Sequence, residues 1–382
     1  MNTTRREFIK SAVVSGAALS VGAMTPLTAR AEDKPKPAGK KMKTLFLGGT
    51  GFLGPHTVRA ALARGHEMTL FNRGKTHPEL FPNVEKLVGD RYSDLEALKG
   101  RKWDAVIDTF AYVPKVVEDS AGLLNDAVKQ YVLISSISVY PSYKVVGMDE
   151  TADVATISDE EIAKAKTHRD ITGANYGALK ALCEQTAEKI MPGRVTNIRP
   201  GLIVGPGDPS DRFTYWPVRV DRGGEVLAPG SGKDYIQFID VRDLGAWIVM
   251  CIENGVFGVF NADSPQATNT VASMLATCKQ VSQSDAKFTW VPADFLAEQK
   301  VQPWSDMPVW APPEGEDIGF GQVSVAKAMK AGLKHREVKE TVADTLKWFK
   351  SEPQERQANL RAGIKPEREK EVLAAWHEKQ GD

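Results

Sequence analysis

The chain has 382 residues, of which 42% are hydrophobic and 26% charged, a composition typical of a soluble globular protein. The 49 Lys and Arg residues balance the 49 Asp and Glu residues, so no net field draws the protein to nucleic acid or lipid. The length allows one large α/β domain with a smaller appended region. Cys183, Cys251 and Cys278 are widely spaced and fit no metal-ligand pattern, so we expect buried thiols and no metal site.

The first 31 residues have the layout of an export signal. Paired arginines in Thr4 to Lys10, followed by Phe-Ile-Lys, match a twin-arginine signal. A mild apolar run, Ser11 to Met24, and the Ala29-Arg30-Ala31 cleavage pattern complete it. A membrane anchor is the alternative, but the run is too short and too rich in small residues for the ~20 apolar residues of a bilayer span.

Two expectations follow from this signal, and one alternative opposes them. Export through the twin-arginine machinery places the mature protein in the periplasm or outside the cell. Because this route generally carries folded proteins, a cofactor loaded in the cytoplasm can be exported with the chain. The alternative is a cytoplasmic protein with a spurious leader, which a periplasmic fraction lacking the mature protein would support.

The stretch from Lys43 to Gly54 predicts a strand, a glycine turn and a helix. Thr44 to Leu47 is apolar and β-prone, and after the turn apolar residues recur at helical spacing. The G-x-x-G-x-x-G pattern permits a tight turn and close approach of a pyrophosphate, which the helix N-terminus would bind. An ordinary strand–helix turn is the alternative. The predicted dinucleotide contacts are Gly48, Thr50, Gly51, Phe52, Leu53 and Gly54.

The end of the next predicted strand, Glu67 to Phe71, bears on the choice between NAD and NADP. An acidic residue at this place would accept hydrogen bonds from the adenosine ribose and favour NAD. The sequence has Asn72 instead, followed by Arg73, which suits a 2′-phosphate. NADP is therefore favoured over NAD, and the alternative is that Arg73 is a solvated loop charge.

Strands and helices continue to alternate, which predicts an α/β, doubly wound parallel sheet, the Rossmann fold. Polar residues 141–171 predict an excursion over the carboxyl edge of the sheet, either a lid or a solvated loop. Further strands are expected at Val84–Val88, Asp104–Thr109, Tyr131–Ser135 and Val195–Ile198, and helices at Lys115–Val128 and Gly173–Ile190.

The alternation fails after Gly205, which predicts a smaller C-terminal substrate-binding region. Ile236–Ile239 and Val256–Phe260 are candidate strands that return to the sheet, and Thr341–Phe349 and Glu367–Gln380 are candidate helices. The expected division is a signal peptide (1–31), a linker (32–41), an NAD(P)-binding Rossmann domain (42–205), a substrate-binding region interleaved with the last Rossmann strands (206–350) and a charged C-terminal helix (351–382).

Tyr176 and Lys180 are four residues apart on a predicted helix and therefore share a face. A phenol, with a pKa of about 10, is a weak base at neutral pH unless a neighbouring cation stabilises its phenolate. Ser136, at the end of the preceding strand, would donate to a substrate oxygen. The three residue types fit hydride transfer coupled to proton transfer, and a surface Tyr–Lys pair is the alternative.

With these motifs in order, the chain resembles an extended, atypical short-chain dehydrogenase/reductase of the NAD(P)-dependent epimerase/dehydratase family. The branch it is most similar to lies near the chloroplast stem-loop RNA-binding proteins, judging by Phe71 to Lys75. The matching stretches are Gly48 to Gly54, Gly89-Asp90, Leu133 to Tyr140, Tyr176 to Lys180, Arg199 to Asp208 and Ile239 to Leu244.

The resemblance implies Tyr176 as catalytic acid or base, Lys180 as its partner and Ser136 in the hydroxyl role. It also implies that Asp90 meets the adenine, that Thr109 to Tyr112 line the ribose path and that Pro200 borders the nicotinamide. The family often forms homodimers, so a dimer is expected. Further pocket candidates, each equally consistent with packing or exposure, are Tyr112, His168, Arg169, Phe213, Tyr215, Trp216 and Arg219.

One departure from the family pattern bears on the substrate. Ile236-Gln237 replaces the usual Arg-Asp pair, which in the family often contacts a sugar-nucleotide diphosphate. The leading hypothesis is an exported oxidoreductase or epimerase acting on a hydroxyl of a carbohydrate-like small molecule. The alternative is a non-catalytic, nucleotide-containing binding protein of the stem-loop-like branch, although neutral charge and the lack of a basic stripe argue against RNA.

Overall fold

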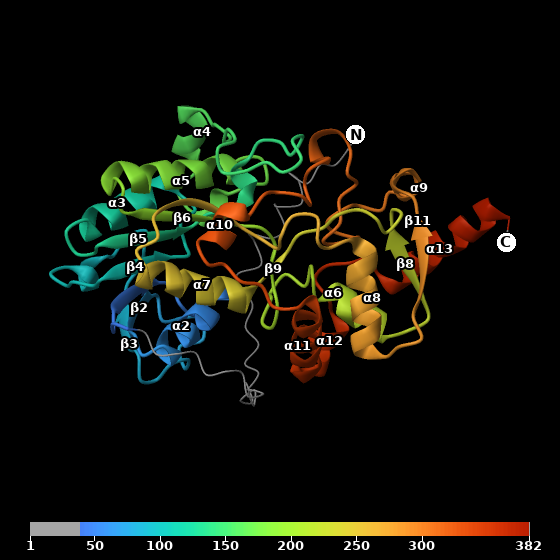
Figure 1. The fold of residues 1–382 in the computed structure, drawn as a ribbon, viewed down its shortest axis with the longest axis horizontal. Helices are drawn as coiled ribbons and strands as arrows, with labels where there is room; N and C mark the ends of the chain where they lie inside the picture. The colour runs from blue at the N-terminus through green and yellow to red at the C-terminus, as the bar shows by residue number, and fades with distance from the viewer. Residues whose placement is uncertain (1–38, 382) are drawn as a thin grey trace.

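The computed structural model describes residues 39–381. The predicted signal peptide and residues 32–38 of the predicted linker lie outside the described residues. A lobe built on a large sheet and a smaller lobe lie side by side (Figure 1). Within residues 39–381, none of the helices combines the length and the apolar character that crossing a membrane requires.

The large lobe is organised around a seven-stranded sheet with the order β10-β6-β5-β4-β1-β2-β3. Every neighbouring pair is parallel, so the predicted doubly wound Rossmann sheet is confirmed. The strand order reverses between β1 and β4, where such sheets bind ligands. The strands are β1 (Lys43–Leu47), β2 (Glu67–Asn72), β3 (Glu85–Val88), β4 (Ala105–Asp108), β5 (Gln130–Ile134), β6 (Val195–Pro200) and β10 (Gly258–Ala262).

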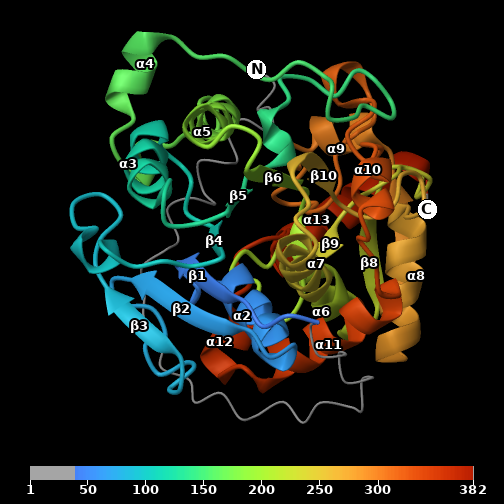
Figure 2. The same ribbon diagram turned by 60° about the vertical axis from the view of Figure 1, so that its left-hand side comes forward.

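Helices cover both faces of this sheet (Figure 2). Alternate side chains of a strand point to opposite faces: Phe46 packs into the core beneath α2 (Leu53–Ala63) and α7 (Val241–Glu253). Leu45 and Leu47 pack into the core beneath α3 (Pro114–Leu124) and α5 (Tyr176–Ile190). The central strands are therefore mostly apolar, as expected of strands that are buried on both faces.

The smaller lobe has a separate core and two short parallel strand pairs. Of the two stretches predicted to rejoin the large sheet, Val256–Phe260 corresponds to β10, and Ile236–Ile239 was wrong because its end pairs with β7 instead. The elements are β7 (Ile203–Val204), β9 (Ile239–Asp240), β8 (Glu225–Pro229), β11 (Lys287–Val291), α6 (Tyr215–Asp221), α8 (Val271–Ser282), α9 (Ala293–Glu298), α11 (Val338–Ser351) and α12 (Gln354–Ala358), while α10 (Ala326–Lys330) packs on β10.

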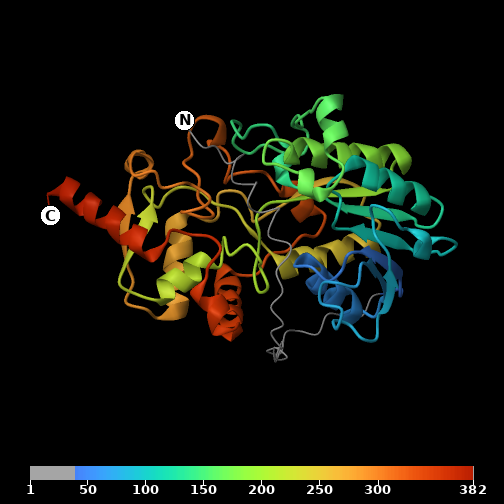
Figure 3. The same ribbon diagram turned by 180° about the vertical axis from the view of Figure 1, so that it is seen from behind.

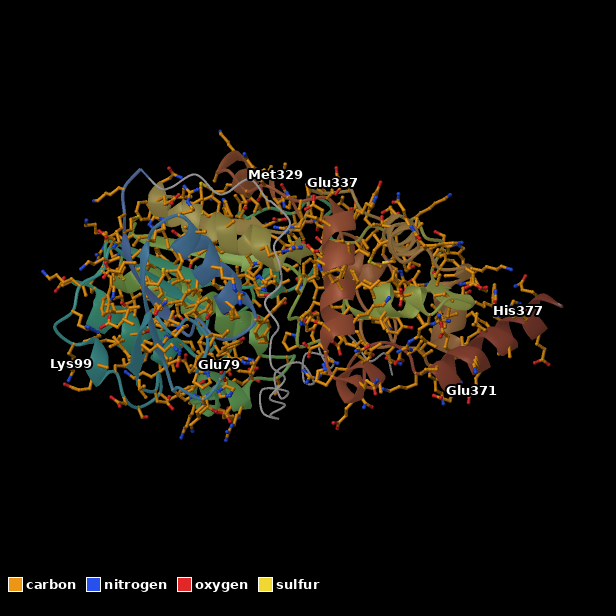
Figure 4. All side chains as sticks on the ribbon, turned by 90° about the horizontal axis from the view of Figure 1, so that it is seen from below. Glu79, Lys99, Met329, Glu337, Glu371 and His377 are labelled. Atoms are coloured by element: carbon orange, nitrogen blue, oxygen red, sulfur yellow. The ribbon has the colours of Figure 1, made fainter. Side chains whose placement is uncertain are left out.

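The last helix, α13 (Pro366–Gln380), runs along the smaller lobe and projects from it (Figure 3). Its buried Glu369 accepts hydrogen bonds from Arg219 Nε at 2.7 Å and from the Leu227 N–H of β8 at 3.0 Å. Through Glu369, the helix therefore supplies the hydrogen-bond acceptor for the Leu227 N–H of a short strand. Its labelled side chains Glu371 and His377 lie at the opposite end of the molecule from Glu79 and Lys99 (Figure 4).

All three cysteines are free and buried, as predicted. Burial raises the pKa of Cys183 and of Cys251 to about 12. At neutral pH these thiols are protonated, so they pack as small apolar groups.

Candidate functional site

The turn between β1 and α2 requires glycine at three positions. Gly48 and Gly49 have φ angles of 115° and 91°, which residues with side chains rarely adopt. A Cβ on Gly54 would fall 2.5 Å from the Gly49 backbone. Gly51 is different, because a Cβ there would meet nothing within 4 Å. Packing does not require glycine at position 51, and the open space suits close approach of a pyrophosphate.

The first turn of α2 offers unpaired backbone donors. It has neither a side-chain cap nor an acidic residue, so its N–H groups and positive dipole end are available to an anion. Thr50 is buried beside this turn, Phe52 stands at the N-cap and Leu53 begins the helix. The six residues predicted from the glycine pattern thus lie together around one turn with an uncapped helix N-terminus.

Asn72, at the end of β2, shapes the glycine turn. Its Nδ2 donates to the Gly48 carbonyl at 2.9 Å, and its Oδ1 accepts from the Gly74 N–H at 2.8 Å. Because the amide is used on both sides, its contribution to a cofactor site is to position the backbone. The next side chain, Arg73, is exposed. It makes no hydrogen bond or ion pair within residues 39–381.

Asp90 and Thr109 follow the ends of β3 and β4. Asp90 Oδ1 accepts a hydrogen bond from the Tyr92 N–H at 2.9 Å, which fixes a tight turn. Thr109 Oγ1 donates to the Leu47 carbonyl at 3.3 Å and stands 2.9 Å from where a Gly48 Cβ would be. Both residues therefore lie at the sheet edge that carries the glycine turn.

A buried ion pair beneath this edge was missed in the sequence. Arg91 donates to both carboxylate oxygens of Asp108, at 2.7 and 2.9 Å, and the Tyr131 hydroxyl donates to one of them at 2.6 Å. Burial is the largest single influence and opposes ionisation of Asp108, but the Arg91 charge together with the hydrogen bonds to the carboxylate holds its pKa below the usual range. Two features of the sequence could have predicted this pair. Asp108 is an acidic residue at the end of an apolar strand, and Arg91 directly follows Gly89-Asp90.

Lys180 is buried one turn after Tyr176, which begins α5 and is partly exposed. Its Nζ donates to the Ala111 carbonyl at 2.7 Å and to the Ile134 carbonyl at 2.5 Å, joining the ends of β4 and β5. Burial lowers the pKa of Lys180. The ammonium also lies 5.0 Å from the ring centroid of Tyr112, whose ring is 6.3 Å from that of Tyr176.

Ser136 lies beside the start of α5. A Cβ on Gly177 would fall 1.9 Å from the Ser138 carbonyl oxygen, so glycine is what allows the helix to approach the turn that follows Ser136. The Ser136 Oγ accepts a hydrogen bond from the Ser138 N–H at 3.1 Å. Its own proton has no acceptor within residues 39–381, which leaves it available to a substrate oxygen.

The loop after β6 is tied to the helix that follows the glycine turn. Pro200 is buried at the end of β6, and further along, the Pro206 carbonyl lies 3.0 Å from His56 Nε2 on α2. Burial lowers the pKa of His56 to about 4, so at neutral pH this ring is uncharged and Nε2 is the donor. His56 was missed in the sequence because only the fold brings position 206 to α2.

The excursion over residues 141–171 is neither wholly solvated nor wholly packed. Tyr143 and Met148 join a small core with Ile137, and Ala165 and Ile171 pack against Leu179 of α5. Between them, α4 (Asp159–Lys164) has no buried residue. We call residues 141–171 the cover segment, because its ends pack around the start of α5.

The pocket candidates divide into two groups. Tyr112 contacts Tyr176 and Lys180, and His168 on the cover segment contacts Tyr92, so these two belong to the sheet edge. The exposed side chain of Arg169 makes no hydrogen bond or ion pair in the described part of the chain. For four others the packing alternative applies: Phe213, Tyr215 and Trp216 lie in the core of the smaller lobe, and Arg219 pairs with Glu369.

Ile236 and Gln237 have structural roles. Ile236 is 3% exposed in the core of the smaller lobe. The Gln237 amide donates to the Ser264 and Val323 carbonyls at 2.8 and 2.9 Å and accepts from the Val323 N–H at 2.7 Å. The position at which the resemblance expected an arginine therefore offers no cation.

Together, the parallel sheet, its glycine turn and the Ser–Tyr–Lys edge define a protein of the NAD(P)-binding Rossmann class. Residues 44–262 match the family described as "NAD dependent epimerase/dehydratase family". The match covers more than half of the chain, and the chain belongs to this family.

Relatives and solved structures agree with this assignment. The chain is 26% identical over 255 residues to the mouse "Epimerase family protein SDR39U1", covering 60% of this chain and 78% of that protein. The Bordetella bronchiseptica enzyme WbmG in complex with NAD and UDP superposes with a TM-score of 0.59 at 16% identity, covering 86% and 97% of the two chains. Human SDR39U1 with NADPH gives 0.53 at 20% identity, covering 80% and 99%. The structural likenesses establish the fold.

Proposed function

We propose that the protein is an exported, NADP(H)-dependent oxidoreductase or epimerase that acts on a hydroxyl group of a carbohydrate-like small molecule. The observation that carries the proposal is the grouping of Ser136, Tyr176 and Lys180 at the sheet edge that also holds the glycine turn. The open space at Gly51 and the uncapped N-terminus of α2 fit a dinucleotide pyrophosphate. A bound nicotinamide would supply hydride acceptance and return.

In this proposal, the protein's own groups handle the proton. Tyr176 takes the proton of the substrate hydroxyl as the carbinol carbon is oxidised, and returns it in the reverse direction. The Ser136 hydroxyl donates to the same substrate oxygen. Gly177 allows the start of α5, which carries Tyr176, to pack against the turn that follows Ser136.

Lys180 has a defined place in this scheme. An ammonium group has three donors, and two of them are held by the Ala111 and Ile134 carbonyls. The third donor remains for the cofactor ribose or for the Tyr176 oxygen. A cation that is held rigidly one turn below the phenol stabilises the phenolate without reorganisation during the reaction.

The preference for NADP over NAD rests on β2. The side chain that would read the ribose hydroxyls is an amide already bound to Gly48 and Gly74, and the Arg73 cation beside it is unpaired within residues 39–381. The substrate class rests on the absence of a cation at position 236, which disfavours a nucleotide diphosphate. Export rests on the twin-arginine pattern of residues 1–31.

The test is a screen of purified mature protein with NADP(H) and NAD(H) against aldoses, polyols and uronic acids. Net oxidation or reduction appears as a change in cofactor absorbance, and epimerisation appears as a new sugar isomer at constant absorbance. Turnover by wild type that is lost in Tyr176→Phe supports the proposal. Tight cofactor binding with neither readout across the panel would favour a non-catalytic binding protein.

A further inference from the structure

At His168, the cover segment makes hydrogen bonds to the loops around the predicted adenosine end of the site. The Tyr92 hydroxyl accepts from the His168 N–H at 2.7 Å and lies 3.0 Å from His168 Nδ1. The two rings stack with centroids 5.9 Å apart, and the Phe110 ring lies 5.3 Å from the imidazole. Tyr92 follows Asp90 by two residues, and Phe110 follows Thr109, so three segments converge here.

The hydrogen bonds determine which imidazole nitrogen faces outward. A phenol has one proton; since the Tyr92 oxygen already accepts from a backbone N–H, its proton is donated to Nδ1. Nε2 then carries the proton of the neutral ring, and it has no hydrogen-bond partner within residues 39–381. A polar ring atom is thus held in place without a hydrogen-bond partner in the described part of the chain.

Arg73 is the second unpartnered polar group at this place. It follows β2 directly, where NADP-binding Rossmann folds carry an arginine for the adenosine 2′-phosphate. Burial and then the positive charge of Arg73 lower the pKa of His168. Burial raises the pKa of Tyr92, and the charge of Arg73 partly opposes this increase. The guanidinium and the imidazole therefore share one electrostatic environment, although they come from β2 and from the cover segment.

We propose that His168 Nε2 and Arg73 together bind the adenosine 2′-phosphate of NADP, so that the cover segment takes part in the choice of cofactor. The inference rests on the proposed NADP dependence and adds a recognition residue to it. His168 is expected to be protonated in the complex. Its Nδ1 then donates to the Tyr92 oxygen, whose own proton turns away, and Nε2 donates a charge-assisted hydrogen bond to a phosphate oxygen. NAD lacks this phosphate and gains nothing from the proton.

The surrounding charges set the pH dependence. Arg73 and Arg169 oppose protonation of His168, whereas Asp90 and Asp170 favour it, and in the free protein burial and the cations prevail. A phosphate monoester is largely dianionic above a pH of about 6, which reverses the balance. NADP binding therefore takes up a proton, and the contribution of His168 to NADP affinity falls as pH rises.

The test compares NADP and NAD dissociation constants, measured by calorimetry, for wild type, His168→Gln, His168→Lys and Arg73→Ala. His377→Gln, at the far end of α13, is the matched control. We expect His168→Gln to weaken NADP about tenfold at a pH near 6, as for loss of one charge-assisted bond, and to have little effect near pH 8. The ratio of variant to wild type removes the titration of the phosphate itself. His168→Lys should keep NADP affinity at both pH values, and NAD affinity should be the same in all variants.

Two results overturn the inference alone: unchanged NADP affinity in His168→Gln while Arg73→Ala is weakened, or an equal loss for NAD and NADP, which marks a structural role. Absence of binding of both cofactors to wild type would instead overturn the proposed function. Stronger binding of NAD than of NADP would show that Arg73 does not select the 2′-phosphate, and the inference depends on that selection.

Discussion

The edge of the large sheet and the aromatic part of the smaller lobe differ in whether their polar groups have hydrogen-bond partners. At the sheet edge, the Ser136 proton, the Arg73 guanidinium and the first N–H groups of α2 have no partner within residues 39–381. In the smaller lobe, Trp216 donates its indole N–H to the Pro308 carbonyl at 2.6 Å, and Arg219 pairs with Glu369. Polar groups left available at a sheet edge indicate a binding site, whereas paired ones indicate a framework.

This comparison predicts that changes at the sheet edge affect activity with little effect on folding. Tyr176→Phe is the largest case: removal of a general acid–base group should lower kcat about 10²- to 10⁴-fold while cofactor affinity and Tm stay close to wild type. Steady-state kinetics with calorimetric binding measure both. Tyr235→Phe, on an exposed tyrosine of the smaller lobe, is the matched control, and equal turnover in the two variants would exclude Tyr176 from the mechanism.

Changes in the framework should have the reverse effect. Glu369→Ala leaves Arg219 and the Leu227 N–H without their partner, and loss of one member of a buried pair costs about 3–5 kcal/mol of unfolding free energy. Denaturant unfolding should show this loss, with kcat per folded molecule retained. Glu367→Ala is exposed on the same helix and should change stability by less than about 0.5 kcal/mol. Equal losses in both variants would contradict the assigned role of Glu369.

His56 joins α2 to the loop after β6 through the Pro206 carbonyl, and it should make the free energy of unfolding depend on pH. The pKa of its ring is lowered from 6.5 to about 4 in the folded protein, so between these values the unfolded chain binds a proton that the folded chain does not. Unfolding free energy should therefore fall as pH falls through this window, by about 3 kcal/mol from this group. Chemical denaturation across the window should show a shallower slope for His56→Gln, and parallel slopes would contradict the low pKa.

Gly51→Ala should give the smallest effect, but it separates cofactor binding from folding most clearly. Because a Cβ at this position meets no protein atom within 4 Å, folding and Tm should be unchanged. Cofactor affinity should fall at least about tenfold, or ~1.4 kcal/mol, because the methyl group occupies the space of the pyrophosphate. Gly122→Ala on α3, equally open, should leave affinity unaltered, and unaltered affinity in Gly51→Ala would place the pyrophosphate elsewhere.

The sequence predicted most of the large lobe because its signals are local. The apolar run before Gly48 and the Tyr176–Lys180 spacing depend on neighbours within a few residues, and the strands end within one or two residues of where they were expected. Burial of Phe213, Tyr215 and Trp216 depends on what packs against them from distant parts of the chain, so a cluster of aromatic residues could not be assigned to a pocket or to a core.

The same reason explains which site features were missed. The Arg91–Asp108 pair and the His56–Pro206 contact join residues that are 17 and 150 positions apart. The excursion before Tyr176 was left open between a lid and a solvated loop, because its polar composition conceals the few apolar residues that anchor its ends. Its contact with Tyr92 was not predictable from spacing.

The most direct test of the central claim is titration of the purified mature protein with NADPH and with NADH, followed by nicotinamide fluorescence. We expect saturable binding of both cofactors, NADPH at least about tenfold tighter than NADH, and binding weakened at least about tenfold in Gly51→Ala but not in Gly122→Ala. Failure of wild-type protein to bind either cofactor would contradict a dinucleotide site at the glycine turn.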